Sequence, residues 1–108
     1  MAKFEIYKDT GGQFRFRLKA GNGQSILASE AYTTKAACNN GVESVKKNAP
    51  DDKRYERLTN KKGEPYFNLK STNGQVIGTS ESYSSTSAME NGISSVKTNA
   101  PKAAVEEV

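Results

Sequence analysis

The residues most evidently able to bind a ligand are three basic ones that occupy alternate positions of one short stretch. The segment FRFRLK at 14–19 carries Arg15, Arg17 and Lys19. Because successive side chains of a strand point to opposite faces, this spacing places the three cations on one face. The corresponding set 51 residues later is Tyr66, Asn68 and Lys70. Cations, an amide and an aromatic ring on an open sheet face could hold a phosphate backbone.

A solvated sheet face whose charges discourage aggregation is the competing interpretation of these six residues. The second set supplies one cation only, and the pair of aromatic rings expected of an RNA-recognition sheet is absent. The sequence therefore favours the solvated face over a nucleic-acid site.

Two Glu-x-Tyr pairs are the other polar groups of interest, Glu30 with Tyr32 and Glu81 with Tyr83. Such pairs are weak indications of catalysis, and the sequence has no histidine, no glycine-rich phosphate loop and no GxSxG motif. The lone Cys38 falls at an apolar helix position, where core packing explains it. We predict no catalytic residue, no cofactor and no metal site. The pairs themselves are read as structural, with a glutamate near a helix start and a tyrosine packed over it.

Composition restricts the chain to a small protein with one core. It has 108 residues, 34% of them hydrophobic, and a net charge of +4. That length suits a single domain, and no stretch approaches the 18 apolar residues of a membrane span. We therefore expect one cytoplasmic domain over 1–108, without membrane contact.

A tandem duplication dominates the organisation of the chain. Residues 22–50 align without a gap with residues 73–101, and about 16 of the 29 paired positions are identical. We place repeat one at about 1–50 and repeat two at about 52–108, with a polar link at 51–54.

Each repeat changes from a period of two to a period of 3.6, which predicts three strands followed by a helix. In repeat one the strands are expected at 4–8, 14–19 and 25–29, with a tight turn at Asn22-Gly23. The helix should start after a cap at Thr33-Thr34 and end before Pro50. Its apolar stripe is Cys38, Val42, Val45 and Ala49.

A lone βββα unit would cover its sheet poorly, so the two repeats should share one core. We predict an α+β fold with one antiparallel sheet and both helices on the same face. From the residues alone, 103–108 is either a frayed tail or an edge strand. A small-residue flank predicts an inter-repeat seam where the two helices meet, made by Ala37, Gly41, Ser44, Ala88, Gly92 and Ser95.

The motifs FEIYKD and FRFRLKA, together with NGQ, SE-x-Y and G-[VI]-x-SVK-x-NA, which occur in both repeats, closely resemble the YegP-like bacterial family of unknown function. The resemblance covers nearly the whole chain. It implies a pseudo-twofold pair of βββα(β) units whose C-terminal strands are exchanged between repeats, so that 103–108 is a strand. It brings no activity, substrate or site residue. Arg57, which takes the place of Ile6, leaves the facing of the second repeat's first strand open.

The functional expectation is a non-catalytic binding or protein-interaction module. The alternative is weak, sequence-tolerant nucleic-acid binding through the basic sheet face. We expect a protein partner and a monomer whose repeats mimic a dimer. Whether the repeated Ser-Glu-x-Tyr and Ser-Val-Lys-x-Asn-Ala-Pro residues are structural or functional is left open.

Overall fold

A computed structural model describes residues 2–108 of the chain. Repeat one contributes β1 (Lys3–Lys8), β2 (Phe14–Lys19), β3 (Ser25–Ala28) and α1 (Lys35–Asn48). Repeat two contributes β4 (Tyr55–Thr59), β5 (Pro65–Lys70), β6 (Val76–Thr79), α2 (Thr86–Asn99) and β7 (Ala104–Glu107). The polar link forms a short 3₁₀ helix, η1 (Asp52–Arg54), and η2 (Ala100–Lys102) is its counterpart after α2.

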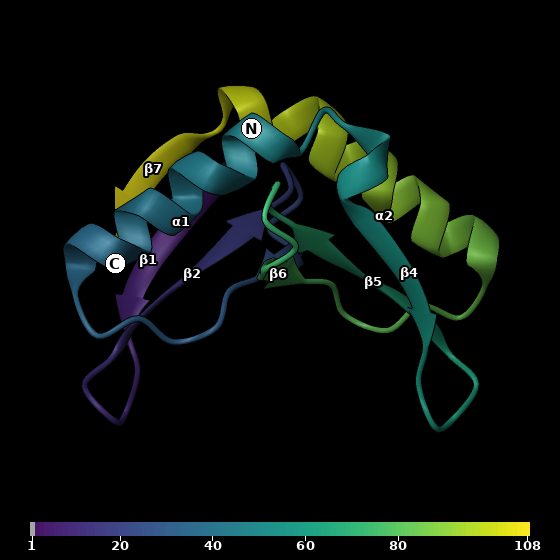
Figure 1. Ribbon diagram of the computed structural model, residues 1–108, viewed down its shortest axis with the longest axis horizontal. Coiled ribbons are helices and arrows are strands. Elements are labelled where there is room, and N and C mark those ends of the chain that lie inside the picture. The colour runs from purple at the N-terminus through teal and green to yellow at the C-terminus, as the bar shows by residue number, and fades with distance from the viewer. Residues whose placement is uncertain (1) are drawn as a thin grey trace.

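One sheet runs through both repeats in the order β4-β5-β6-β3-β2-β1-β7, and both helices lie on the same side of it (Figure 1). The repeats join where β3 pairs with β6, with Ala28 opposite Thr79. These two residues are equivalent in the duplication, so the pseudo-twofold axis passes between them. The predicted α+β architecture is confirmed.

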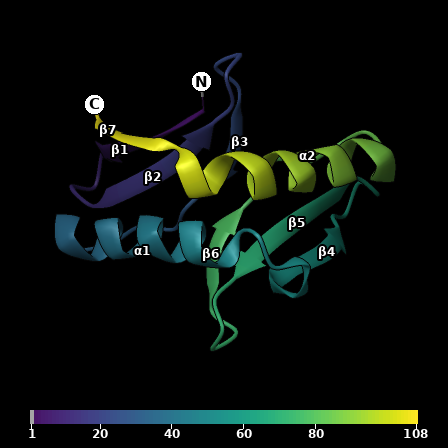
Figure 2. The same cartoon turned by 90° about the horizontal axis from the view of Figure 1, so that it is seen from above.

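The last strand departs from an all-antiparallel sheet. β7 pairs in parallel with β1, Lys3 lying opposite Ala104. The chain leaves α2 in repeat two and crosses to the outer edge of repeat one (Figure 2), which confirms the exchanged strand. The equivalent segment after α1 continues directly into β4. The outer edge of β4 therefore has no neighbouring strand in the described part of the chain.

Hydroxyl caps start both helices, as the sequence predicts. The Thr34 side chain accepts a hydrogen bond from the Ala37 N–H at 3.1 Å, and Ser85 does the same for Ala88. Each cap satisfies one of the free amides of the first turn. The helix limits then follow from Thr34 at the start and Pro50 shortly after the end.

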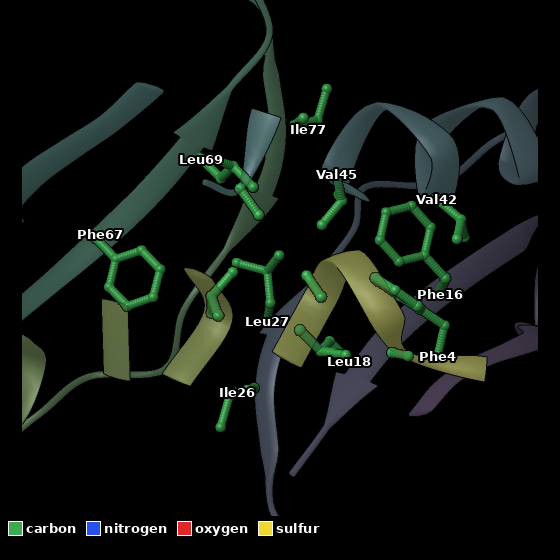
Figure 3. Packing of buried hydrophobic residues seen from close by; sticks show 14 of the residues in the cluster. Phe4, Phe16, Leu18, Ile26, Leu27, Val42, Val45, Phe67, Leu69 and Ile77 are labelled. Atoms are coloured by element: carbon green, nitrogen blue, oxygen red, sulfur yellow. The ribbon is translucent and has the colours of Figure 1, made fainter. Parts of the chain in front are cut away.

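A single hydrophobic cluster occupies the space between the sheet and the helices and draws on both repeats (Figure 3). The rings of Phe4, Phe16 and Phe67 are fully buried within it. Cys38 is also fully buried, as core packing requires, and burial raises the pKa of its thiol. In the described residues, neither α-helix has the length and apolar character needed to cross a bilayer.

Leu27 and Gly78 show how closely the two repeats approach each other near the pseudo-twofold axis. A Cβ atom added to Gly78 would lie 2.7 Å from the Leu27 side chain. The two positions are equivalent in the duplication, so leucine at both would place two large side chains in this space. The divergence of the repeats here, leucine in one and glycine in the other, lets the shared core close.

Candidate binding site at the junction of the repeats

The serine of the Ser-Glu-x-Tyr motif fixes the chain at the end of the sheet. Ser29 accepts a hydrogen bond from the Phe16 N–H at 2.9 Å and donates one to the Glu30 carbonyl at 2.8 Å. Ser80 makes the same two bonds in repeat two. A buried N–H needs such a partner. The serine is therefore structural, and it leaves the glutamate carboxylate exposed beside it.

The tyrosine of the motif lies between the sheet and the helix. The backbone of Tyr32 exchanges hydrogen bonds of 2.7 and 2.8 Å with Phe14, and its ring stacks on Phe16 with centroids 6.2 Å apart. Burial, and secondarily the charge of Glu30, raise the pKa of the Tyr32 phenol. Its hydroxyl therefore stays protonated at neutral pH and is available for hydrogen bonding.

The position of these tyrosines contradicts the expected packing of helix against helix at the two glycines. A Cβ atom on Gly41 would lie 2.5 Å from the Tyr32 hydroxyl, and one on Gly92 would lie 2.2 Å from the Tyr83 hydroxyl. Each glycine thus makes room for the tyrosine of its own repeat. The two helices overlap only near their C-terminal ends (Figure 2). The prediction that Gly41 and Gly92 pack helix against helix was therefore wrong.

The rest of the small-residue flank has other neighbours. Ala88 supplies the N–H that Ser85 caps, and Ser95 accepts hydrogen bonds from the Asn99 side chain through both its carbonyl and its hydroxyl. In repeat one, Ala37 and Ser44 line a hollow instead.

This inter-repeat hollow has a volume of about 270 Å³ and opens between α1 and the β5–β6 hairpin of the other repeat. It is lined by Glu30, Tyr32, Ala37, Asn40, Gly41 and Ser44 of repeat one and by Ser71, Asn73, Gln75, Val76 and Ile77 of repeat two. Neither repeat could form it alone, because each supplies one wall.

Residues that are identical in the two repeats concentrate around this hollow. Nine of its eleven lining residues have the same residue type 51 positions away. That share exceeds the 16 of 29 found along the aligned segments. The duplication therefore supplies a second set of the same side chains at the symmetry-related place.

The second set differs from the first in one contact. The Gln24 amide donates a hydrogen bond to the Glu81 carboxylate at 3.1 Å, which joins the hairpin of repeat one to the Ser-Glu-x-Tyr segment of repeat two. The Tyr83 hydroxyl beneath is buried without a hydrogen-bond partner in the described residues. No equivalent bond joins Gln75 to Glu30 within residues 2–108. The first hollow therefore presents a free carboxylate.

The electrostatics of the first hollow are simple. Glu30 is its one acidic side chain, and neither lysine nor arginine is among the lining residues. The remaining polar groups are the Tyr32 hydroxyl and the serine and side-chain amide groups around it. The hydroxyl and amide groups of this set can donate and accept hydrogen bonds, and the Glu30 carboxylate can accept them.

The basic sheet face is largely neutralised by neighbouring carboxylates. Arg15 pairs with Asp9 at 2.9 Å, while Arg17 and Lys19 both reach Glu5, at 2.8 and 3.3 Å. The cross-strand register, with Glu5 opposite Arg17, produces this cluster. The Arg17 guanidinium also lies 4.5 Å from the centroid of the Tyr7 ring.

The second set on that face is separate from the first. Both Lys70 and Asn68 bond to Glu56 at 3.1 Å. Because β6 and β3 lie between β5 and β2, three strand spacings, about 14 Å, divide the two sets. The six residues, Tyr66 included, therefore lie in two separate groups on the sheet, and their role as an anion or nucleic-acid face stays a prediction.

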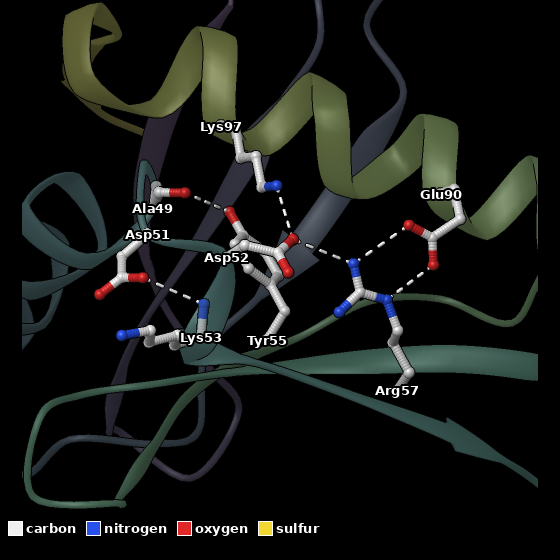
Figure 4. Close-up of polar contacts among 8 residues, drawn as sticks. All are labelled: Ala49, Asp51, Asp52, Lys53, Tyr55, Arg57, Glu90 and Lys97. Carbon is white, nitrogen blue, oxygen red and sulfur yellow. Dashed lines mark hydrogen bonds and ion pairs between the residues drawn. The ribbon is translucent and has the colours of Figure 1, made fainter.

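The free edge of β4 carries a third polar cluster (Figure 4). The Arg57 guanidinium contacts Glu90 of α2 at 2.7 and 3.1 Å and Asp52 at 3.1 Å. Lys97 reaches the same Asp52 oxygen at 2.6 Å. These contacts lower the pKa values of Asp52 and Glu90, chiefly through hydrogen bonds from Lys97 and Arg57 respectively. Arg57 therefore faces the helices, which settles the facing of this strand.

Sequence reasoning missed both the hollow and the edge cluster. Asn73 and Gln75 entered the sequence analysis only through the doubled NGQ motif and were given no binding role, although both are identical in the two repeats. The signal for the edge cluster was a pair of coordinated differences between repeats. Ile6 becomes Arg57 and Asn39 becomes Glu90, so both partners of an ion pair appear together in repeat two.

A family model described as "Domain of unknown function (DUF1508)" matches the chain twice, over residues 9–56 and 60–107. The chain belongs to this family. Each matched unit includes a β-hairpin, a helix and the start or whole of the strand that follows. In the DUF1508 unit the exchanged strand is therefore part of the repeat.

Relatives of this DUF1508 protein share the UPF0339 designation. A UPF0339 protein in the ptx operon 5′ region of Stutzerimonas stutzeri is 62% identical over 97% of this chain and 95% of the relative. UPF0339 protein YegP of Escherichia coli O157:H7 is 48% identical over 96% of this chain and 94% of the relative. The solution NMR structure of UPF0339 protein SO3888 from Shewanella oneidensis superposes with a TM-score of 0.93 at 48% identity, covering 98% of this chain and 90% of that chain. None of these names specifies an activity.

Proposed function

We propose that this DUF1508 protein is a cytoplasmic, non-catalytic binding module whose ligand contacts the inter-repeat hollow. The observation that supports this site is the convergence of Glu30, Tyr32 and Asn40 of one repeat on Asn73 and Gln75 of the other. A volume of about 270 Å³ lies at the low end for ligand sites, which commonly span about 300–1,000 Å³. The hollow is better suited to one side chain of a protein partner than to a large cofactor.

Nucleic-acid binding through the sheet face has less support. Lys19 and Lys70 each have a carboxylate within 3.3 Å, and Arg15 and Arg17 are paired at shorter distances. A phosphate backbone would have to compete with these carboxylates for the same cations.

Chemical-shift mapping with the ¹⁵N-labelled full chain tests the proposal. A partner is first captured on the protein from native cytosol, with and without nuclease, and is then titrated into the labelled chain. We expect shifts at the amides of Gly41, Ser44 and Asn73 that survive nuclease treatment. Shifts confined to the outer faces of β2 and β5, with affinity that falls steeply as salt rises, would instead establish the nucleic-acid alternative.

A further inference from the structure

The two symmetry-related sites differ in whether their glutamate has an internal hydrogen-bond donor, and this difference indicates a ligand class for the first site. In repeat two the Glu81 carboxylate accepts an N–H from Gln24. In the first hollow the same carboxylate, that of Glu30, has no N–H donor from the described residues. The intramolecular contact of Gln24 therefore stands in for an N–H-bearing ligand group at the free site.

Charge narrows the class of that group. The lining of the first hollow includes Glu30 and no cation, so a phosphate or carboxylate ligand would meet only like charge. A cationic N–H group would satisfy the carboxylate by charge-assisted hydrogen bonds, which are stronger than those of a neutral amide. The side-chain oxygen of Asn40 can accept another of its protons, whereas that of Asn73 already accepts from the Ser71 hydroxyl and the Gln75 N–H.

Taken with the small volume, this chemistry points to a single basic side chain. We propose that the first hollow receives a lysine-type ammonium group from a partner polypeptide, with Glu30 as the charged acceptor. The inference rests on the proposed function, because it names the ligand class of the same site. The second site takes no such group while Gln24 holds Glu81.

Two glutamates in equivalent positions provide a matched pair of variants. The probe is Nα-acetyl-lysine methylamide, and its Nε-acetylated form is the neutral control. With the labelled full chain we expect saturable shifts at Gly41 and Asn73 with one probe bound per chain. Glu30→Gln and the neutral control should each weaken binding at least about tenfold, the loss expected when one charge-assisted contact is removed. Glu81→Gln should change the affinity less than twofold.

Gln24→Ala offers a gain-of-site test, because removing the internal donor frees Glu81. We expect the number of bound probes to rise from one to two, with new shifts at Gly92. Equal binding of the neutral probe, or unchanged affinity in Glu30→Gln, would overturn the ammonium assignment while leaving the hollow as a binding site. An absence of shifts with the basic probe would overturn it as well. Chemical-shift mapping with the captured partner tests the proposed function independently of these results.

Discussion

At the scale of single residues, the serine and the tyrosine of the repeated Ser-Glu-x-Tyr motif make structural contacts that the glutamate of repeat one lacks. Ser29 satisfies a buried backbone N–H, and Tyr32 stacks on Phe16 and against Gly41. Glu30 has no comparable structural contact among the described residues. The motif thus holds one carboxylate at the rim of the hollow by means of its two neighbours.

Gly41→Ala tests the close approach of this tyrosine. Replacing glycine by alanine inside a helix stabilises the helix by about 1 kcal/mol. The new Cβ, however, would lie 2.5 Å from the Tyr32 hydroxyl. Overpacking in a core costs about 1–3 kcal/mol, so we expect a net loss of stability, measured by urea unfolding. Gly11→Ala is the control, because its Cβ would meet only Asp9 at an ordinary 3.4 Å. A Gly41→Ala protein more stable than wild type would contradict this packing.

Tyr55 provides a residue whose ionisation is linked to folding. Its hydroxyl donates to the Ala49 carbonyl at 2.7 Å, and burial raises the pKa of its phenol well above the usual value. The unfolded chain loses this proton near pH 10, about the ordinary tyrosine pKa, while the folded chain retains it. Unfolding is therefore favoured as the pH rises above that value.

Tyr55→Phe should separate this effect from the titration of other groups. At neutral pH we expect a loss of about 1 kcal/mol for one buried hydrogen bond. Between pH 9 and 11, the wild-type free energy of unfolding should fall more steeply than that of the variant, by up to about 1.4 kcal/mol per pH unit. Urea titrations at several pH values measure both quantities. Parallel curves for the two proteins would show that Tyr55 ionises alike in both states.

At the scale of elements, the two outer edges of the sheet are protected differently. β7 covers β1, whereas the equivalent edge of β4 carries the Arg57 cluster. An exposed strand edge invites pairing with another chain, and charged side chains are one means of preventing it. Repeat two has Arg57 where repeat one has Ile6, and this difference is consistent with the absence of a strand that covers β4.

Arg57→Ile restores the residue of repeat one and tests this role. The lost contacts are partly exposed ion pairs, so we expect stability to fall by no more than about 1 kcal/mol. Self-association should nevertheless increase, because an apolar residue replaces the charge at the open edge. Sedimentation velocity over a range of concentrations measures this, with Arg57→Lys as the charge-preserving control. An Arg57→Ile protein that stays monomeric throughout would rule out edge protection as the function of the cluster.

Local signals explain how much of these elements the sequence predicts. The alternation of apolar and charged residues predicted β2 at 14–19. The capping threonines and Pro50 predicted the limits of α1. Both signals depend only on residues that are neighbours in the chain. The parallel pairing of β7 and the hollow depend on contacts between residues far apart in the chain. The cross-strand partners Glu5 and Glu56 were missed for the same reason, so the sheet face seemed more basic than it is.

At the scale of the whole molecule, the duplication has produced one body whose halves are no longer interchangeable. Strands β3 and β6 meet at equivalent residues, and one cluster of buried side chains serves both repeats. Near this axis Leu27 and Gly78 complement each other in size. Two copies of repeat one would bring two leucines together there, which a close-packed core tolerates poorly.

Exchanging these two residues tests both the pseudo-symmetry and the shared core. Leu27→Gly should remove about 2–5 kcal/mol of stability, as large-to-small core substitutions do. Gly78→Leu should cost about 1–3 kcal/mol by overpacking against Leu27. In the double variant the leucine enters from the opposite repeat into the space that the first leucine left. Its cost should therefore be smaller than the sum of the single costs by about 1–3 kcal/mol, the coupling typical of residues in contact.

Chemical unfolding of the wild type, both single variants and the double variant measures this coupling. The single variants serve as the controls, and an unchanged dependence on denaturant would show that all four proteins unfold as one unit. Strict additivity of the two costs would mean that Leu27 and Gly78 do not share one space. The pseudo-twofold packing, and with it the inter-repeat hollow that depends on the same junction, would then need a different description.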